Sequence, residues 1–228
     1  MTLFATLAFI VIAGMTVRNV QKGVAVMYSS NVTVADLRVE KIGDEAIHLK
    51  NQTTDSTVIG NSIDTTGLNS PNYGEGVYIG TAAGNLCAYN SCQPDLTLRN
   101  LIAFNDIRNT TAESIEAKGT TADGTIWKNT MDGAGITSSD TDSLVQILGS
   151  GWVIAGNVGS GTPADAIQVW SGTDNGAGVN NIVYGNSEAD AFPGYIVRMP
   201  YVDGGNVVGC DNVAPQATLG LSNKTCQN

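Results

Sequence analysis

The sequence has 228 residues, 42% hydrophobic and 14% charged, so it holds enough apolar material for one substantial core. Its 11 lysines and arginines against 21 aspartates and glutamates give a formal net charge of −10, which argues against a nucleic-acid partner, since phosphate binding needs a concentrated basic surface. The 27 glycines and the many Val, Thr, Ser and Asn residues favour short strands joined by tight turns, and therefore predict a single all-β domain.

Residues 1–14 differ from the rest of the chain. Leu3–Ile12 is an apolar run that resembles the hydrophobic region of a signal peptide and is too short to span a bilayer. Because no Lys or Arg precedes this run, a strand or helix that caps the first coil is an equal alternative. We place the domain boundary here and expect one repeat domain over residues 15–228, whose abrupt start at Met15 leaves room for earlier coils.

One short pattern recurs along the chain from that point. It is an acidic or small residue followed by alternating apolar positions, as in EAIHLK. Its copies are Gly23–Met27, Glu45–Lys50, Glu75–Gly80, Glu113–Lys118, Leu144–Leu148, Asp165–Trp170 and Tyr195–Met199. Successive copies lie about 22 to 38 residues apart, which is typical of solenoid coils with inserted loops.

A second pattern, apolar-x-x-Asn, lies between these copies. It ends at Asn61, Asn105, Asn129, Asn157 and Asn186. In a parallel solenoid such asparagines stack, and their amides can hydrogen-bond from coil to coil. A propeller or sandwich would instead need hairpins, and the NG and DG pairs here do not separate alternating runs. We therefore predict a single-stranded right-handed parallel β-helix of about seven coils, with inserted loops at 67–74, 81–96 and 172–180 on its functional face.

The four cysteines fall into two local pairs, Cys87 with Cys92 and Cys210 with Cys226. Neither pair has the spacing of a zinc site, and the one histidine cannot complete a Cys/His cluster. We predict two disulfides, one that closes a short loop and one that ties down the C-terminal tail, as in a secreted protein.

Strand alternation predicts which side chains point out of the solenoid. In EAIHLK, Ile47 and Leu49 face the core, so His48 and Lys50 face outward. The same parity gives one outward row of Ala25, His48, Tyr78, Glu116, Gln146, Gln168 and Arg198. The neighbouring row is Met27, Lys50, Gly80, Lys118, Leu148 and Trp170. A solvated face is the simplest interpretation, but the mixture of His, Tyr, Trp and Gln is typical of a sugar-binding groove.

A separate acidic column marks where the strands of the first pattern begin. It consists of Glu45, Glu75, Glu113 and Asp165. Aligned carboxylates repel one another unless backbone N–H groups or a cation screen them. Turn capping is one interpretation of the column. A Ca²⁺ site at Glu45, Glu75 and Glu113 is the other.

Several segments resemble secreted right-handed β-helix repeat proteins of the pectin-lyase-like superfamily. They are GDEAIHLK, GEGVYIG, TAESIEAKGTTADGTI and the closing GCDN…LSNKTC. The resemblance extends from Met15 to the end of the chain and implies the fold. It does not imply one reaction, because this superfamily includes polysaccharide lyases, glycoside hydrolases, epimerases and non-catalytic adhesins.

The lyases of this superfamily typically abstract the C5 proton of a uronic acid with Lys or Arg, while Ca²⁺ or another cation neutralises the carboxylate. The resemblance implies Lys118 or Lys50 as the base, Arg198 or the other lysine on the carboxylate, and His48 or Tyr78 as the proton donor. An inverting hydrolase fits less well, because Glu116 is the one carboxylate in the outward rows.

The first hypothesis is therefore an extracellular polysaccharide lyase acting on a uronic-acid-containing glycan. Its predicted catalytic centre is His48, Lys50, Tyr78, Glu116 and Lys118. Its predicted substrate-binding residues are Gln146, Gln168, Trp170 and Arg198. The second hypothesis is a non-catalytic β-helix that binds glycan or builds a surface structure. In both cases we expect a monomer with a polysaccharide partner, no nucleic acid and no membrane span.

Overall fold

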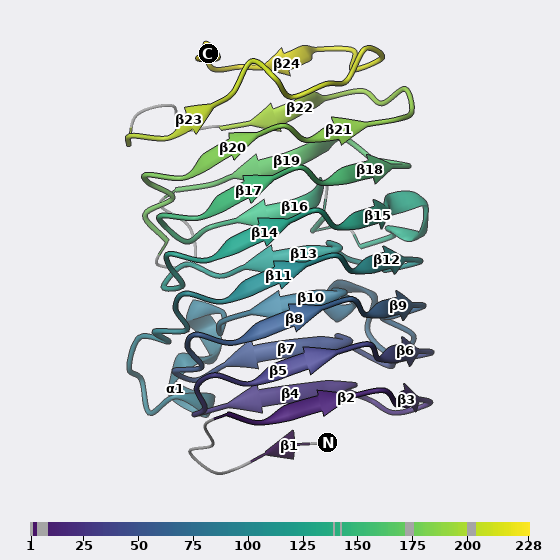
Figure 1. Cartoon of the computed structure of the whole chain (residues 1–228), viewed down its shortest axis with the longest axis vertical. Helices are drawn as coiled ribbons and strands as arrows, with labels where there is room; N and C mark the ends of the chain where they lie inside the picture. The colour runs from purple at the N-terminus through teal and green to yellow at the C-terminus, as the bar shows by residue number, and fades with distance from the viewer. Residues whose placement is uncertain (1, 4–8, 139, 142, 172–175, 200–203) are drawn as a thin grey trace.

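The computed structural model describes residues 2–3, 9–138, 140–141, 143–171, 176–199 and 204–228. Its short strands stack along one long axis and form three parallel sheets (Figure 1). The chain passes through the sheets in turn, and each strand pairs in parallel with its equivalent in the neighbouring coil. This arrangement confirms the predicted parallel β-solenoid.

We call the three sheets sheet 1, sheet 2 and sheet 3. Sheet 1 contains β1 (Thr2–Leu3), β4 (Val24–Met27), β7 (Ile47–Lys50), β10 (Val77–Ile79), β13 (Ile115–Ala117), β16 (Ser143–Ile147), β19 (Asp165–Val169), β22 (Tyr195–Arg198) and β24 (Gly220–Ser222). Sheet 2 contains β2 (Val11–Ala13), β5 (Thr33–Ala35), β8 (Thr57–Ile59), β11 (Leu101–Ala103), β14 (Thr125–Trp127), β17 (Val153–Ala155), β20 (Ile182–Tyr184) and β23 (Val207–Val208). Sheet 3 contains β3 (Thr16–Arg18), β6 (Arg38–Glu40), β9 (Ser62–Asp64), β12 (Asp106–Arg108), β15 (Thr130–Asp132), β18 (Val158–Ser160) and β21 (Ser187–Glu188).

The solenoid has about eight turns, where seven were predicted. The seven copies of the first pattern all lie in sheet 1, and β1 and β24 extend that sheet at its two ends. Neither of these end strands shows the acidic-then-alternating pattern, so the sequence did not reveal them. Within the predicted segment 1–14, residues 1 and 4–8 lie outside the described part of the chain, while β2 is already a strand of sheet 2 that pairs with β5.

The core is the interior of the solenoid, filled by inward rows of side chains from all three sheets. Ile47 and Leu49 of β7 are fully buried there, as the alternation predicted. Burying such a side chain contributes roughly 1.5–3 kcal/mol, and β-branched residues suit a pleated surface. Repetition of these rows therefore fixes the register, since a slip of one residue would turn every apolar side chain outward.

The predicted asparagine ladder runs along the turn between sheets 2 and 3. Asn61 Nδ2 donates to Asn105 Oδ1 across 2.9 Å, and the same contact continues through Asn129, Asn157, Asn186 and Asn212. All of these residues are buried. The Oδ1 atom of each asparagine from Asn105 onward also accepts the backbone N–H of the asparagine one coil before it. The ladder thus satisfies polar groups that the interior would otherwise leave without partners.

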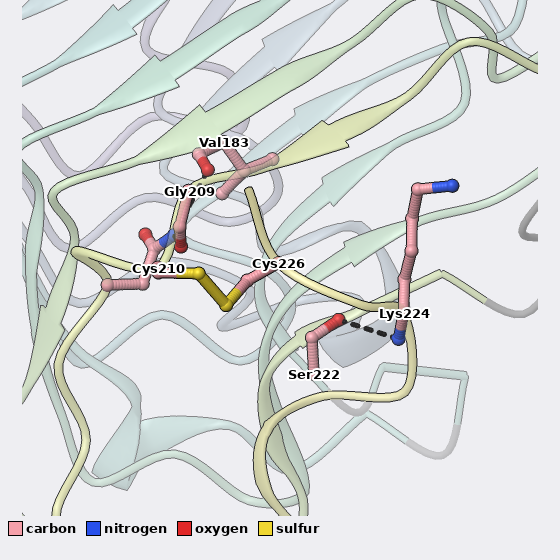
Figure 2. The surroundings of a disulfide bond; sticks show 7 residues. Val183, Gly209, Cys210, Ser222, Lys224 and Cys226 are labelled. Carbon is pink, nitrogen blue, oxygen red and sulfur yellow. Dashed lines mark hydrogen bonds between the residues drawn. A yellow bond between two sulfur atoms is a disulfide. The ribbon is translucent and has the colours of Figure 1, made fainter. Parts of the chain in front are cut away.

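Both predicted disulfides are present. Cys210–Cys226 joins the final segment to the last coil, where Gly209 N also donates to Val183 O across 2.8 Å (Figure 2). Cys87–Cys92 lies in the inserted loop 81–96, which also contains η2 (Ala83–Asn85) and α1 (Leu86–Tyr89).

Two further 3-10 turns lie in connecting segments, η1 (Pro71–Tyr73) in the inserted loop 67–74 and η3 (Gly133–Gly135) after β15. Of the third predicted loop, residues 172–175 lie outside the described part of the chain. Among the residues that the structure describes, no helix has the length and apolar character needed to cross a membrane.

Candidate functional site

The outward row predicted from alternation is in register along sheet 1. Direct pairing joins Ala25, His48, Tyr78, Glu116, Gln146, Gln168 and Arg198 in that order. Several side chains of this row are nevertheless shielded from solvent: His48 and Glu116 are 5% and 3% exposed, and Gln168 is fully buried. Neighbouring side chains and inserted loops cover these residues, which alternation alone cannot indicate.

A cavity of about 340 Å³ opens over β7 and β10. Three of the five predicted catalytic residues line it: His48, Lys50 and Tyr78. The rest of its wall comes largely from the two inserted loops, through Ser70, Tyr73, Thr81, Ala82, Asn85 and Tyr89, and from Gln21, Lys22, Asp44 and Glu45. The cavity therefore concentrates the polar groups of the first coils, and the predicted loops enclose it.

His48 is held at both ring nitrogens by the protein itself. Its Nδ1 lies 2.8 Å from Glu45 Oε1, and its Nε2 lies 2.8 Å from the carbonyl oxygen of Gly80. A carbonyl oxygen only accepts hydrogen bonds, so Nε2 carries a proton. Burial lowers the pKa of His48, while the hydrogen bond and charge of Glu45 act in the opposite direction. Both ring nitrogens are therefore engaged by groups of the protein itself.

Glu45 joins His48 to the positive charge of Lys22. Lys22 Nζ lies 2.5 Å from Glu45 Oε2 and 3.6 Å from Asp44 Oδ2. Burial acts to raise the pKa of Glu45, but its contacts with His48 and Lys22 outweigh burial and lower that pKa to about 2. Glu45 is therefore an anion throughout the neutral range.

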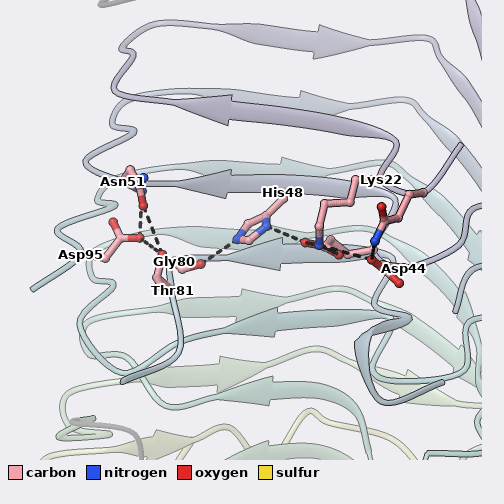
Figure 3. A network of polar contacts seen from close by, with 9 residues as sticks. Lys22, Asp44, His48, Asn51, Gly80, Thr81 and Asp95 are labelled. Carbon is pink, nitrogen blue, oxygen red and sulfur yellow. Dashed lines mark hydrogen bonds and ion pairs between the residues drawn. The ribbon is translucent and has the colours of Figure 1, made fainter. Parts of the chain in front are cut away.

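These contacts belong to a longer polar chain (Figure 3). It runs from Lys22 and Glu45 through His48 to Gly80, and continues from the next residue, Thr81, whose Oγ1 donates to Asp95 Oδ2 across 2.7 Å. Asp95 is fully buried and also accepts the backbone N–H of Asn51 at 2.8 Å. Asp95 thus fixes the loop 81–96 to the end of β7, beside the cavity.

Lys50 lines the cavity at the end of β7. Its Nζ lies 4.7 Å from the centre of the Tyr89 ring, and among the described residues it forms no ion pair. Burial lowers the pKa of Lys50, with Glu45 acting in the opposite direction. A lowered pKa increases the fraction of neutral amine, which is the form that accepts a proton.

Tyr78 stands between the cavity and the next coil. Its ring meets that of His48 edge-on, with the centroids 4.5 Å apart and the planes at 67°. On its other side Lys118 Nζ lies 5.5 Å from the ring centre. Lys118 Nζ also contacts Glu116 Oε1 at 2.5 Å, so Glu116 and Lys118 form an ion pair one coil beyond the cavity wall.

Glu116 of this pair also belongs to a group of three buried carboxylates. One oxygen each of Glu75, Glu113 and Glu116 lies within 4.8 Å of the others, and such a group could hold a metal ion. Burial, together with the charge of Glu116, raises the pKa of Glu75 well above its usual range and that of Glu113 to about 8. The predicted metal set named Glu45 as the third ligand. Glu45 instead turns toward Lys22 and His48, and Glu116 takes the third place.

The predicted substrate-binding residues form a second polar group further along sheet 1. Gln168 Nε2 donates to Asp165 Oδ2 at 2.8 Å, and Trp170 Nε1 donates to Gln168 Oε1 at 2.5 Å. Arg198 contacts Asp165 Oδ2 at 3.2 Å and lies 5.9 Å from the Trp170 ring centre. Asp165 also accepts the backbone N–H of Tyr195, so at this position the turn-capping interpretation of the acidic column fits. Gln146, which is partly exposed, connects this group to Glu116 in the register.

Sequence reasoning missed several residues of the cavity wall. Tyr73 and Tyr89 lie in the loops that were predicted to be functional, but no periodicity assigns a direction to a loop side chain. Lys22 and Asp44 precede the strands and fall outside the alternating pattern. The aromatic residues in the two inserted loops were the available signal.

Comparisons with known proteins agree with this architecture. No protein-family model and no curated protein matches the sequence. Among solved structures, the chain is similar to the crystal structure of an alginate lyase from Paenibacillus sp. str. FPU-7, with a TM-score of 0.82 and 27% sequence identity. The match covers 94% of this chain and 73% of the lyase chain. The chain therefore shares the solenoid of an alginate lyase over almost its entire length.

Proposed function

We propose that this protein is an extracellular polysaccharide lyase that cleaves a uronic-acid-containing glycan, with alginate as the first substrate to test. The observation that carries the proposal is the placement of Lys50, with its lowered pKa, in one cavity with Tyr78. The structural similarity to an alginate lyase supports the same reaction class. The two disulfides support an oxidising, extracellular location.

The reaction is a β-elimination within one uronate residue. Neutral Lys50 takes the proton from C5, the C4–O4 bond breaks, and a double bond forms between C4 and C5. The phenol of Tyr78 gives its proton to the departing O4, so the two proton transfers balance the cleavage. Lys118, held beside the Tyr78 ring by Glu116, supplies positive charge for the substrate carboxylate.

His48 is a positioning residue in this proposal. Both of its nitrogens bond within the protein, so its ring is fixed against the edge of Tyr78. Of the two proton donors that the resemblance implied, the geometry therefore favours Tyr78 over His48. Fixing the phenol matters because proton transfer requires close and well-aligned donor and acceptor atoms.

The buried carboxylates Glu75, Glu113 and Glu116 fit a Ca²⁺ ion by the chemistry of their ligand atoms, since Ca²⁺ prefers carboxylate oxygens. We propose that they bind Ca²⁺ and that the ion relieves their mutual repulsion behind the Glu116–Lys118 pair. When bound, it would add positive charge near the substrate carboxylate.

Gln146, Trp170 and Arg198 bind sugar residues further along the polymer in this proposal, and the fully buried Gln168 supports them from beneath. The Trp170 ring offers an apolar face, and Arg198, with 41% of its side chain exposed, offers a charge for a second carboxylate. The network through Gln168 and Asp165 holds the Trp170 and Arg198 side chains in place before substrate arrives.

Incubation with alginate, polygalacturonate and a neutral glucan, followed by ultraviolet absorbance of the unsaturated product, tests the proposal. We expect absorbance to rise with at least one uronate polymer and to stay flat with the neutral glucan. No rise with either uronate polymer, combined with retained polymer binding, would instead identify a non-catalytic glycan-binding solenoid.

A further inference from the structure

A cluster of exposed aromatic side chains lies on a different sheet from the cavity. The rings of Phe104 and Trp127 meet edge-on, with centroids 5.0 Å apart and planes at 69°. Lys128 Nζ lies 4.7 Å from the centre of the Trp127 ring and 5.9 Å from that of Phe104. All three residues are exposed, with Phe104 at 47% and Trp127 at 37%. We call Phe104, Trp127 and Lys128 the aromatic platform.

The platform lies at the C-terminal ends of β11 and β14, two central strands of sheet 2, where the chain turns toward sheet 3 (Figure 1). The cavity lies over β7 and β10 of sheet 1, and none of its lining residues belongs to the platform. Tyr184, 44% exposed, extends the platform, because Trp127 pairs with Ala155 and Ala155 with Tyr184. Two rungs of a parallel sheet separate the Trp127 and Tyr184 backbones by about 10 Å.

Small residues leave space around the platform. Between Trp127 and Tyr184 the chain places Ala155, followed by Gly156. A Cβ atom at Gly156 would lie 3.8 Å from Trp127 Nε1 and 3.4 Å from Lys128 Cγ. A larger side chain there would cover the ring and the lysine, whereas glycine leaves them accessible.

The backbone at the platform is left-handed at two bulky residues. Phe104 and Lys128 have φ of 55° and 52°. The equivalent residues after β2, β5, β8, β17 and β20 are also left-handed, and they are Gly14, Asp36, Gly60, Gly156 and Gly185. For a non-glycine residue this conformation costs roughly 1–2 kcal/mol. The same turn conformation recurs from coil to coil, and in these two coils it presents a ring and a cation on the surface.

We propose that the aromatic platform is an accessory binding site for an anionic polysaccharide chain. Aromatic faces stack on the C–H faces of pyranose rings, and the Lys128 ammonium selects a sugar that carries a carboxylate. The net charge of −10 repels polyanions in general, so binding one requires local positive charge. Lys128, whose Nζ lies near both rings, supplies that charge at the platform. The choice of a uronate polymer as ligand rests on the proposed function, and a second attachment point would retain the polymer near the cavity.

Affinity electrophoresis in native gels with and without alginate tests the site. We would compare Trp127→Ala and Lys128→Gln with Lys41→Gln, each in a Lys50→Ala background that keeps the polymer intact. Lys41 is the matched control because it is an exposed lysine in the same left-handed turn conformation, with φ of 55°. We expect the apparent dissociation constant for alginate to rise roughly five-fold in Trp127→Ala and Lys128→Gln, as for the loss of about 1 kcal/mol, and to stay unchanged in Lys41→Gln.

Unchanged retardation of Trp127→Ala in alginate gels would overturn the proposal, whether or not the protein cleaves the polymer. Equal weakening of Lys128→Gln in gels of neutral dextran would also overturn it, because the site would not select an anion. Conversely, a protein that releases no unsaturated product but loses alginate affinity in Trp127→Ala would refute the lyase function and leave this site intact.

Discussion

Glu45 Oε1 lies 2.8 Å from His48 Nδ1, and both residues are buried in the wall of the cavity. This contact, with Lys22, keeps the pKa of Glu45 at about 2 in the folded protein, against an ordinary value of 4.5. A depressed carboxyl pKa stabilises the fold above pH 4.5, and that stability is lost as the pH falls from 4.5 toward 2.

We therefore expect Glu45→Gln to lower the free energy of unfolding by roughly 3 kcal/mol at pH 7 and by much less near pH 2. Urea denaturation between pH 2 and 7 measures this difference. Asp55→Asn is the control, because Asp55 pairs with Arg99 on the surface. An equal loss for Glu45→Gln at both ends of the pH range would contradict the assigned ion-pair network.

The phenol of Tyr78 gives a second prediction. Tyr78→Phe keeps the ring that packs against His48 but removes the proton donor. We expect kcat on a uronate polymer to fall by roughly 10²- to 10⁴-fold with little change in KM. Steady-state kinetics with absorbance detection checks this. Tyr89→Phe, which alters a cavity tyrosine that is not assigned to proton transfer, should retain most activity.

The carboxylates Glu75, Glu113 and Glu116 predict a different pH dependence. The folded pKa of Glu113 is raised to about 8, so protonation of this residue stabilises the fold fully below pH 4.5 and the benefit is lost as the pH rises to 8. With EDTA present, we expect the Tm of the wild type to decline as the pH rises from 4.5 to 8. The Tm of Glu113→Gln should decline less, because the variant lacks this titrating carboxyl group. Added Ca²⁺ should restore Tm at pH 8 in the wild type but not in Glu75→Gln. No response of the wild type to Ca²⁺ would refute the metal site.

Glu188 carries the fourth prediction. It occupies the inward row of sheet 3 above Gly159, with Oε2 accepting from Thr162 Oγ1 at 2.7 Å and Oε1 without a partner among the described residues. Burial raises its pKa to about 6, so the charged form destabilises the fold above that pH. Glu188→Gln should therefore gain about 1 kcal/mol of stability at pH 8 and nothing at pH 4. Thermal unfolding at the two pH values measures it, and an equal effect at both would be contrary to this assignment.

Much of the fold could be predicted because it repeats. The alternation around Ile47 and Leu49 set the register of sheet 1, and the asparagines from Asn61 onward marked one turn of every coil. The end strands β1 and β24 were not predicted, because they lack the acidic-then-alternating pattern. Repetition therefore predicts the interior of a solenoid better than its ends.

The site was predictable only as far as backbone periodicity extends. Parity placed His48, Tyr78 and Glu116 on consecutive rungs, which the pairing confirms. It could not predict that Glu45 would contact His48, or that Glu116 would join Glu75 and Glu113 as the third carboxylate, since both depend on side-chain rotation and charge. Nor could it place Tyr89, whose position depends on a disulfide-closed loop.

The central claim is that neutral Lys50 removes a proton from a uronate residue in the cavity. The most direct measurement is the pH dependence of kcat/KM on cleaved polymer for the wild type, Lys50→Ala and Lys41→Ala. Because burial lowers the pKa of Lys50, wild-type kcat/KM should rise with pH and level off below pH 10.5, the ordinary lysine value. We predict a roughly 10²- to 10⁴-fold loss in Lys50→Ala and none in Lys41→Ala. Wild-type activity and an unchanged pH profile in Lys50→Ala would contradict the account.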